Sequence, residues 1–292
     1  MTCFICLCEG GLGRACPCTA SVHAKCLAEF LKRGAPPRCP VCFAAFTSAA
    51  RVAATALLFQ EEPTTANMLN LATILTIDGS PTKAMVLLKN ALPVEPAFFI
   101  PYHLEVAHAF LALGDADQAL PILSKCLDVF FEAQDKAAAC PSIFAHALVL
   151  TAKAHLLRGE VRFADGAITC ALSMAAKLAL EDGLEILYVI RDICAARGDA
   201  PRLVAAQKAI YAITSHEVKD PWEVAHAHAE LLLATIAHQG GGADVAAPLK
   251  NALRILRKRP STDGVAARAS VALAGLVRPQ KRLRAKRHPE AV

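Results

Sequence analysis

The sequence predicts a small cysteine-rich module followed by a long all-α domain of helical repeats. Eight of the twelve cysteines lie within the first 42 residues. Hydrophobic residues make up 55% of the chain but aromatic residues only 5%, so the apolar residues are mainly Ala, Leu and Val, which favours closely packed helices over a sheet. Small residues also recur at one set of offsets, which indicates stacked helical hairpins.

The N-terminal module contains four pairs of candidate metal ligands, each separated by one or two residues. The pairs are Cys3 and Cys6, Cys16 and Cys18, His23 and Cys26, and Cys39 and Cys42. A tight turn can present both members of a pair to one tetrahedral Zn²⁺, so four pairs predict two closed sites that hold structural zinc. The spacing leaves open which pairs share an ion.

Two alternatives concern the same cysteines. A disulfide cluster would need an oxidising compartment, and because a ligand stands at position 3 we expect no secretory signal before the module. Cys8 lies outside the four pairs. We expect it to be a spare cysteine, with an alternative ligand or a reactive thiol as the other interpretations.

The ligand order, four Cys, one His and three Cys, resembles that of the RING-CH (RINGv) variant of the RING finger, over residues 3 to 46. The short Cys16-Pro17-Cys18 step and the His23-x2-Cys26 pair carry the resemblance. It implies cross-brace wiring, in which Cys3, Cys6, His23 and Cys26 bind one zinc ion and Cys16, Cys18, Cys39 and Cys42 bind the other. The PHD finger shares the order but typically has a Trp where this chain has Pro37.

The resemblance also implies a partner. In RING-type ubiquitin ligases, apolar positions between the ligands form a shallow groove for a ubiquitin-conjugating enzyme, and the matching residues here are Ile5, Phe30 and Pro40. The alternative is that these three side chains only complete the small core of the finger. One departure weakens the comparison with active ligases: many have Arg or Lys directly after the last ligand, whereas this chain has Phe43.

After the N-terminal module, the sequence predicts a connecting helix and then a repeat domain that is recognised by its recurring small residues. Residues 47–62 are expected to form a connecting helix, and residues 63–277 a repeat domain. Three segments share spacings of 7, 5 and 7 residues, a pattern that resembles the tetratricopeptide repeat: Ala72, Gly79, Ala84 and Ala91; Ala107, Gly114, Ala119 and Cys126; and Ala152, Gly159, Ala164 and Ala171. Degenerate units are expected around Gly198 and Gly240, followed by a capping helix from Thr262 to Val277. Chance alignment of Ala-rich helices is the alternative.

A stack of this kind forms a concave groove that can hold a peptide or a substrate protein. Some tetratricopeptide domains use Lys and Asn to bind a C-terminal carboxylate. Asn70 is a possible member of such a set, but the matching place in the next repeat holds Glu105. The ligand of the groove therefore stays open.

Charge and hydropathy indicate in which cellular compartment the protein is expected. Residues 251–292 contain eleven Lys or Arg against two acidic residues, so the positive charge of the chain belongs to its C-terminal part. The basic segment 278–292 is expected to be disordered, and it is either a nuclear-import signal, a polyanion-binding extension or a solubilising tail. Mean hydropathy is +0.39, but no uninterrupted apolar run reaches about 18 residues. We expect a soluble intracellular protein of the nucleus or cytoplasm, with no membrane partner and nucleic acid not favoured.

These observations lead to one preferred function and one competitor. The preferred hypothesis is a RING-type ubiquitin-protein ligase, in which the finger docks a ubiquitin-conjugating enzyme and the repeats bind the substrate. No residue is expected to be catalytic, because the covalent intermediate belongs to the conjugating enzyme and the chain supplies positioning. The competitor is a non-enzymatic adaptor that uses both parts for protein–protein interaction.

Overall fold

The structure is a computed structural model, and it describes residues 3–6, 8–9, 15–16, 21–33, 38–42, 44–90, 95–132, 140–174, 178, 180–218, 220–239, 243–258 and 264–285. The chain divides into two compact units, Met1–Val189 and Ile190–Val292. Within the described residues, regular structure is helical, and the isolated β-bridges include those between Cys3 and Ser21 and between Arg38 and Ala45. The prediction of an all-α protein with a cysteine-rich N-terminus is therefore confirmed.

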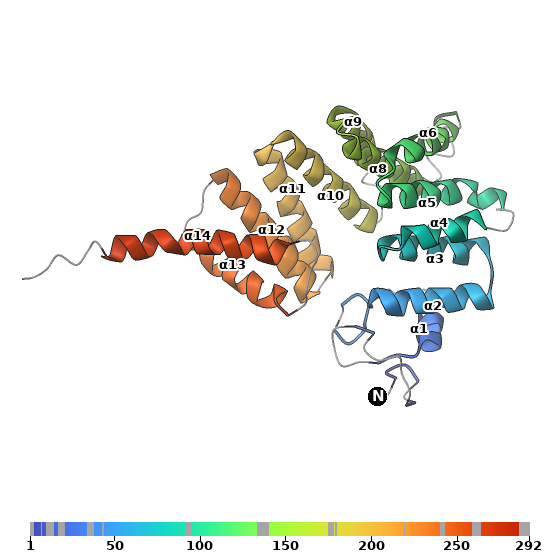
Figure 1. The fold of residues 1–292 in the computed structure, drawn as a ribbon, viewed down its shortest axis with the longest axis horizontal. Coiled ribbons are helices and arrows are strands. Elements are labelled where there is room, and N and C mark those ends of the chain that lie inside the picture. The colour runs from blue at the N-terminus through green and yellow to red at the C-terminus, as the bar shows by residue number, and fades with distance from the viewer. Residues whose placement is uncertain are drawn as a thin grey trace, which may run out of the picture. The chain divides into compact units, whose positions relative to one another are not determined.

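Figure 1 shows the helices in chain order. The first unit contains α1 (Ala24–Lys32), α2 (Ser48–Glu61), α3 (Thr65–Ile77), α4 (Pro81–Lys89), a 3₁₀ turn (Pro96–Phe98), α5 (Phe99–Ala112), α6 (Ala116–Glu132), α8 (Pro141–Leu157) and α9 (Val161–Leu172). Helix α10 (Leu180–Arg197) crosses the unit boundary. The second unit continues with α11 (Ala200–Ile213), a π-helical turn (Thr214–Val218), α12 (Pro221–Gln239), α13 (Ala243–Leu256) and α14 (Val265–Ala285).

The turns between paired helices repeat one geometry. Gly79, Gly114, Gly159 and Gly198 follow α3, α5, α8 and α10, with φ values of 75°, 80°, 75° and 68°. At Gly114, the glycine N–H donates to the carbonyl of Leu111 at 3.0 Å and the N–H of Asp115 donates to that of Phe110 at 2.9 Å. This is the Schellman arrangement, in which a left-handed residue satisfies the last carbonyls of a helix. The sequence pattern therefore located these turns correctly.

The recurring small residues lie where paired helices meet. Those within the described residues are at most 4% exposed: Ala72, Ala84, Ala107, Ala119, Cys126, Ala152, Ala164 and Ala171. Ala91 lies outside the described residues. Small side chains let the helix axes approach closely, and larger residues such as Leu104, Leu123 and Leu150 fill the space between neighbouring hairpins. The packing is similar to that of a helical-repeat stack.

Helix α2 does more than connect the two predicted domains. Ala54 of α2 is fully buried in the same core as Cys3, Cys16 and Cys39, and Leu57 and Leu58 pack against this core. The helix is capped by Thr47, whose hydroxyl accepts from the N–H of Ala50 at 3.4 Å, and α2 also contacts α3. The finger is therefore attached to the stack through a shared helix.

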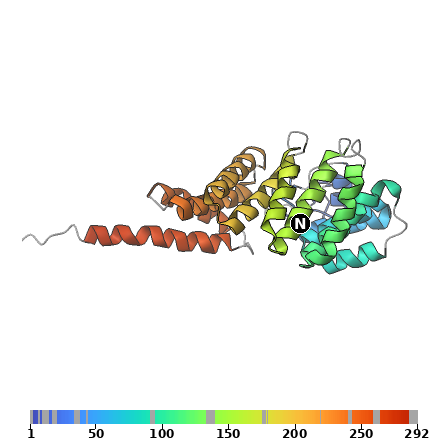
Figure 2. The ribbon, with the colours of Figure 1, turned by 90° about the horizontal axis from the view of Figure 1, so that it is seen from above.

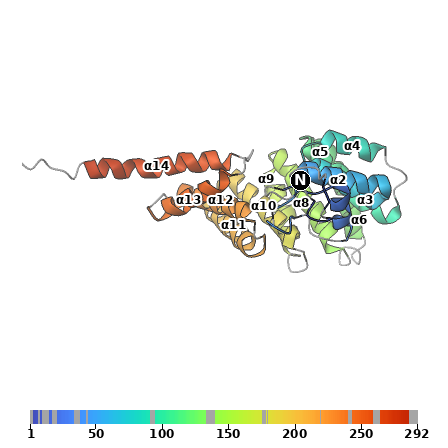
Figure 3. The ribbon, with the colours of Figure 1, turned by 90° about the horizontal axis from the view of Figure 1, so that it is seen from below.

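The end of the chain differs from the sequence-based expectation. The last helix was predicted for Thr262 to Val277, followed by disorder, whereas α14 runs from Val265 to Ala285 and so includes part of the basic segment. Figures 2 and 3 show α14 lying along α12 and α13 and then projecting beyond them. Proline does not end the helix at position 279, just as Pro121 and Pro248 lie inside α6 and α13. Residues 286–292 lie outside the described residues.

Candidate metal centre

The first group of predicted ligands is brought together by a turn and the start of α1. The N–H of Cys3 donates to the carbonyl of Cys8 at 2.9 Å, and the N–H of Phe4 donates to that of Ser21 at 3.1 Å, which places the turn beside α1. His23 is the N-cap of α1, so Cys26, three residues later, lies on the same face of the helix. The Sγ atoms of Cys3, Cys6 and Cys26 and a ring nitrogen of His23 all lie within 4.8 Å of one another.

The orientation of His23 suits a metal ligand. Its Nδ1 atom lies 3.4 Å from Sγ of Cys6 and 3.7 Å from Sγ of Cys26. Its Nε2 atom lies 3.2 Å from the carbonyl oxygen of Glu9 and can donate to it. Metal-ligating imidazoles usually donate their second ring N–H in this way, which fixes the tautomer and turns the other nitrogen toward the ion.

The second group combines Cys16 with a turn that carries Cys39 and Cys42. The N–H of Cys39 donates to the carbonyl of Ala44 at 2.8 Å and closes that turn, and the N–H of Thr47 donates to the carbonyl of Ala15 at 2.7 Å. The Sγ atoms of Cys16, Cys39 and Cys42 lie within 4.8 Å of one another. Those of Cys16 and Cys42 are 3.8 Å apart. Cys18, the predicted fourth ligand, lies outside the described residues.

These distances fit thiols around a metal ion. A disulfide would bring two sulfur atoms to about 2.05 Å, and none of the described cysteines forms one. Two thiolates bound to one tetrahedral ion at about 2.3 Å would be separated by about 3.8 Å, which is the distance between Cys16 and Cys42. The two groups could therefore each hold a metal ion, and their membership matches the grouping that the cross-brace resemblance implies for the described ligands.

The electrostatics of the first group also favour a bound cation. Burial by itself raises the pKa of the Cys3 thiol, but backbone N–H groups of Cys6, His23 and Ile5 lower it to about 6. Burial, and then the sulfurs of Cys6 and Cys3, raise the pKa of Cys26 to about 12. Ionised thiols at Cys3 and Cys6 thus oppose ionisation of Cys26, and a cation among them would remove this penalty.

Cys8 belongs to neither group. It is exposed, and its thiol donates to the carbonyl of Cys6 at 3.4 Å. The neighbouring Cys6 sulfur, through a hydrogen bond and its charge, raises the pKa of the Cys8 thiol. Cys8 is thus outside both groups of candidate ligands, although its thiol lies beside the sulfur of Cys6.

Two of the three predicted partner-contact residues line one hollow on the finger. Ile5, which is 37% exposed, and the half-buried Phe30 border a cavity of about 460 Å³. The other lining residues are Lys25, Cys26, Glu29, Arg33 and Glu61. Phe30 also packs its edge on the ring of Phe46, with centroids 6.3 Å apart, so it serves the core as well as the surface. Pro40 is exposed but is not part of this lining.

Sequence reasoning missed the contribution of α2 to this surface. Glu61 at the end of α2 lines the hollow and lies 4.0 Å from Lys25 of α1, and Glu62 pairs with Lys32. The only sequence signal was an acidic pair at the end of an Ala-rich helix. Phe43, the departure after the last ligand, lies outside the described residues.

The sequence shows little similarity to known proteins. No family model matches the sequence, and no curated protein matches it. The crystal structure of BtubC (BKLC) from P. vanneervenii matches over 84% of this chain and 92% of that chain, with 17% identity and a TM-score of 0.31. A likeness at that level supports no conclusion about fold or function. Within the described part of the chain, no helix combines the length and hydrophobicity that crossing a bilayer requires.

Proposed function

We propose that this protein is a RING-type ubiquitin-protein ligase, with a RING-CH-like finger and tetratricopeptide-like repeats. The supporting observation is the interleaving of the ligand groups along the chain. Cys3 and Cys6 lie with His23 and Cys26, and the pair formed by Cys39 and Cys42 lies with Cys16. In the cross-brace order, the first ligand pair shares a metal ion with the third, and the second shares one with the fourth. In sequential fingers, neighbouring pairs along the chain share an ion.

The proposed metal ions are zinc, with a structural role. A set of one imidazole nitrogen and three sulfurs suits tetrahedral Zn²⁺, and we expect Cys18 to complete the second set. With four protein ligands at each ion there is no open coordination position, so zinc would hold the fold without contacting a substrate. Binding free energy on the order of 10 kcal/mol per site would supply most of the folding energy of the finger.

The proposed reaction takes place on the conjugating enzyme. The amine of a substrate Lys attacks the thioester carbonyl that links ubiquitin to that enzyme, an isopeptide bond forms, and the enzyme's thiol leaves. The finger contributes by holding the conjugating enzyme, with Ile5 and Phe30 as apolar contacts in the hollow. Lys25 and Arg33 beside Glu29 and Glu61 offer charges of both signs at its rim. Pro40 and Val41, the latter 65% exposed, would extend the contact surface.

Elemental analysis and an in-vitro ubiquitination assay test the proposal. We expect two zinc ions per chain, which Cys39→Ser should reduce and Cys8→Ser should not. With ubiquitin, activating enzyme, ATP and a panel of conjugating enzymes, the wild type should form ubiquitin chains. Ile5→Ala should lower the rate about tenfold or more, since it removes a central apolar contact, whereas Ile77→Ala, an exposed Ile on α3, should not.

A non-enzymatic adaptor is the second candidate. Phe43 in place of a basic residue after the last ligand favours it, because that position fastens ubiquitin in the ligases that the finger resembles. Zinc-loaded protein that forms no chains with any conjugating enzyme, but still binds partners through the finger or the repeats, would support the adaptor and reject the ligase.

A further inference from the structure

Two hollows adjoin on the repeat stack, within the first unit. One has a volume of about 360 Å³ and lies between α3, α5 and α8; the other has a volume of about 500 Å³ and lies between α1, α2 and α3. Both are lined by Asn70 and Thr73 of α3. Because they share these residues, the two hollows adjoin along α3, and we call them together the α3 groove.

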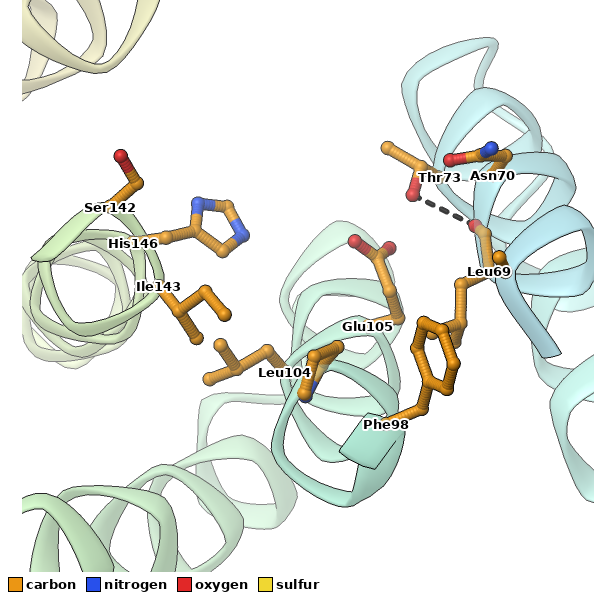
Figure 4. Close-up of a pocket in the computed structure, with 11 residues that line it drawn as sticks. Leu69, Asn70, Thr73, Phe98, Leu104, Glu105, Ser142, Ile143 and His146 are labelled. Atoms are coloured by element: carbon orange, nitrogen blue, oxygen red, sulfur yellow. Dashed lines mark hydrogen bonds between the residues drawn. The ribbon is translucent and has the colours of Figure 1, made fainter. Parts of the chain in front are cut away.

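One end of the α3 groove carries a negative charge that lacks a hydrogen-bond partner. Glu105 of α5 keeps only 14% of its side-chain surface in solvent, and its Oε2 atom makes no hydrogen bond. Figure 4 shows the carboxylate directed into the hollow, between His146 of α8 and Thr73 of α3. The Nδ1 atom of His108 lies 3.6 Å from Oε2, close enough for an ion pair when the imidazole is protonated but too far for a hydrogen bond, and Nδ1 also lacks a hydrogen-bond partner.

The residues around Glu105 favour a ligand with both a cationic and an apolar part. No Lys or Arg is among the residues that line this hollow, and its walls include Leu69, Phe98, Leu104 and Ile143. Lys153 is paired elsewhere, with Glu185 at 2.7 Å, and His146 lies 3.5 Å from that same carboxylate. An alkyl chain ending in a cation fits such a site, because the chain can pack on the walls while its charge reaches Glu105.

The other end of the α3 groove carries the opposite charge. The Nε atom of Arg51 is buried without a hydrogen-bond partner. Burial lowers the pKa of the Arg51 guanidinium, and the charge of Asp78 opposes this effect. Lys32, the other cation in this lining, is already paired with Glu62. An acidic group entering this hollow would therefore find Arg51 as its main partner.

Buried charged atoms that lack hydrogen bonds cost free energy, and a ligand that pairs with them recovers it. We propose that the α3 groove binds an extended peptide segment that places a Lys or Arg side chain against Glu105 and an acidic side chain against Arg51. The peptide backbone would cross Asn70, whose amide can both donate and accept. The inference rests on the proposed function in one respect, that the bound segment belongs to the substrate.

Binding of synthetic peptides to the full-length protein tests this inference without any ubiquitin enzyme, so its result is separate from that of the ligase assay. The probes are fluorescent peptides of about ten residues, blocked at both ends. Each carries one Lys and one Glu in a Leu/Ser background, in both orders and at several separations. At least one arrangement should bind about tenfold more tightly than the same peptide with Gln in place of Lys or of Glu.

Single variants should separate the two ends of the groove. Glu105→Gln should abolish the preference for Lys and keep that for Glu, whereas Arg51→Gln should do the reverse. Glu132→Gln changes an exposed acid on α6 and should change neither. If Arg51→Gln fails to fold, the Glu105 result decides, because its effect on the Lys preference is independent of Arg51.

Three outcomes would overturn the inference. They are equal binding of charged and uncharged peptides, preferences that survive both variants, and binding of Mg²⁺ or Ca²⁺ that is lost in Glu105→Gln while no peptide binds. The last would mean that Glu105 serves a metal ion in place of a peptide.

Discussion

The finger and the helical stack must each bury enough surface to fold, and they differ in which residues are buried. In the finger, the candidate ligands Cys3, Cys16 and Cys39 are themselves among the most buried residues, and Phe46, 3% exposed, is the one buried aromatic residue among those that the structure describes there. In the stack, alanines and leucines from successive helices form the clusters, and the one buried thiol in them, Cys126, lies among apolar side chains. A module of this size has little apolar surface of its own, so metal ions held by these ligands would supplement its small core. The stack is stabilised by apolar packing between helices whose surfaces are complementary in shape.

Removing the metal ions should give the largest effect and test this contrast directly. Treatment with a strong zinc chelator should unfold the finger, because on the order of 10 kcal/mol of binding free energy per site is lost. Amide hydrogen exchange should increase in peptides covering residues 3–46 and stay slow in α5 to α9. An equal increase in α5 to α9 would contradict the comparison, since it would mean that the stack depends on the finger through α2.

The sequence predicted features that depend on local spacing. Gly114 and its counterparts mark turns because a left-handed backbone favours glycine, and the alanines at fixed offsets from them are buried as expected. Ala152 follows Ala107 by 45 residues, whereas Ala107 follows Ala72 by 35, and such a longer interval can reflect a longer helix or an inserted loop. It does reflect a longer helix, since α6 has 17 residues where α4 has 9.

Features that depend on contacts between distant segments were not predictable in the same way. The spacing of the ligand pairs could not decide which pairs share an ion, and only the resemblance to RING-CH fingers did so. Nothing local to α2 indicated that Ala54 would join the core of the finger or that Glu61 would line the hollow beside Ile5. Arg51 and Glu105 could be identified as candidate binding residues only once the structure showed that each has a buried side-chain atom without a hydrogen-bond partner.

A crowding mutation should affect the stack and leave the finger intact. Ala107 is fully buried where α5 meets its neighbours, so Ala107→Leu adds atoms that the packing cannot accept. We expect the free energy of unfolding to fall by about 1–3 kcal/mol, measured by urea denaturation, with unchanged zinc content. Ala112→Leu, at an exposed position of the same helix, is the control and should change stability little. Loss of zinc from the Ala107 variant would show that the two parts are coupled.

The smallest expected effect comes from a polar contact within the stack. Burial raises the pKa of Glu185, but hydrogen bonds and charges from His146 and Lys153 outweigh it and lower the pKa to about 2. Because the folded-state pKa lies below the unfolded value, the stabilisation is complete above about pH 4.5 and is lost as pH falls toward 2. Partial exposure of the carboxylate limits it to about 1–2 kcal/mol.

Glu185→Gln should therefore lower the free energy of unfolding of the helices by about that amount at pH 7, and the difference from wild type should shrink as pH falls below 4.5. Urea denaturation followed by helical circular dichroism at pH 7, 4.5 and 3 measures this. Exposed Glu132→Gln serves as the control for loss of one negative charge. A difference that stays constant or grows at low pH would mean that the ion pairs of Glu185 do not stabilise the stack, which would then rest on apolar packing alone.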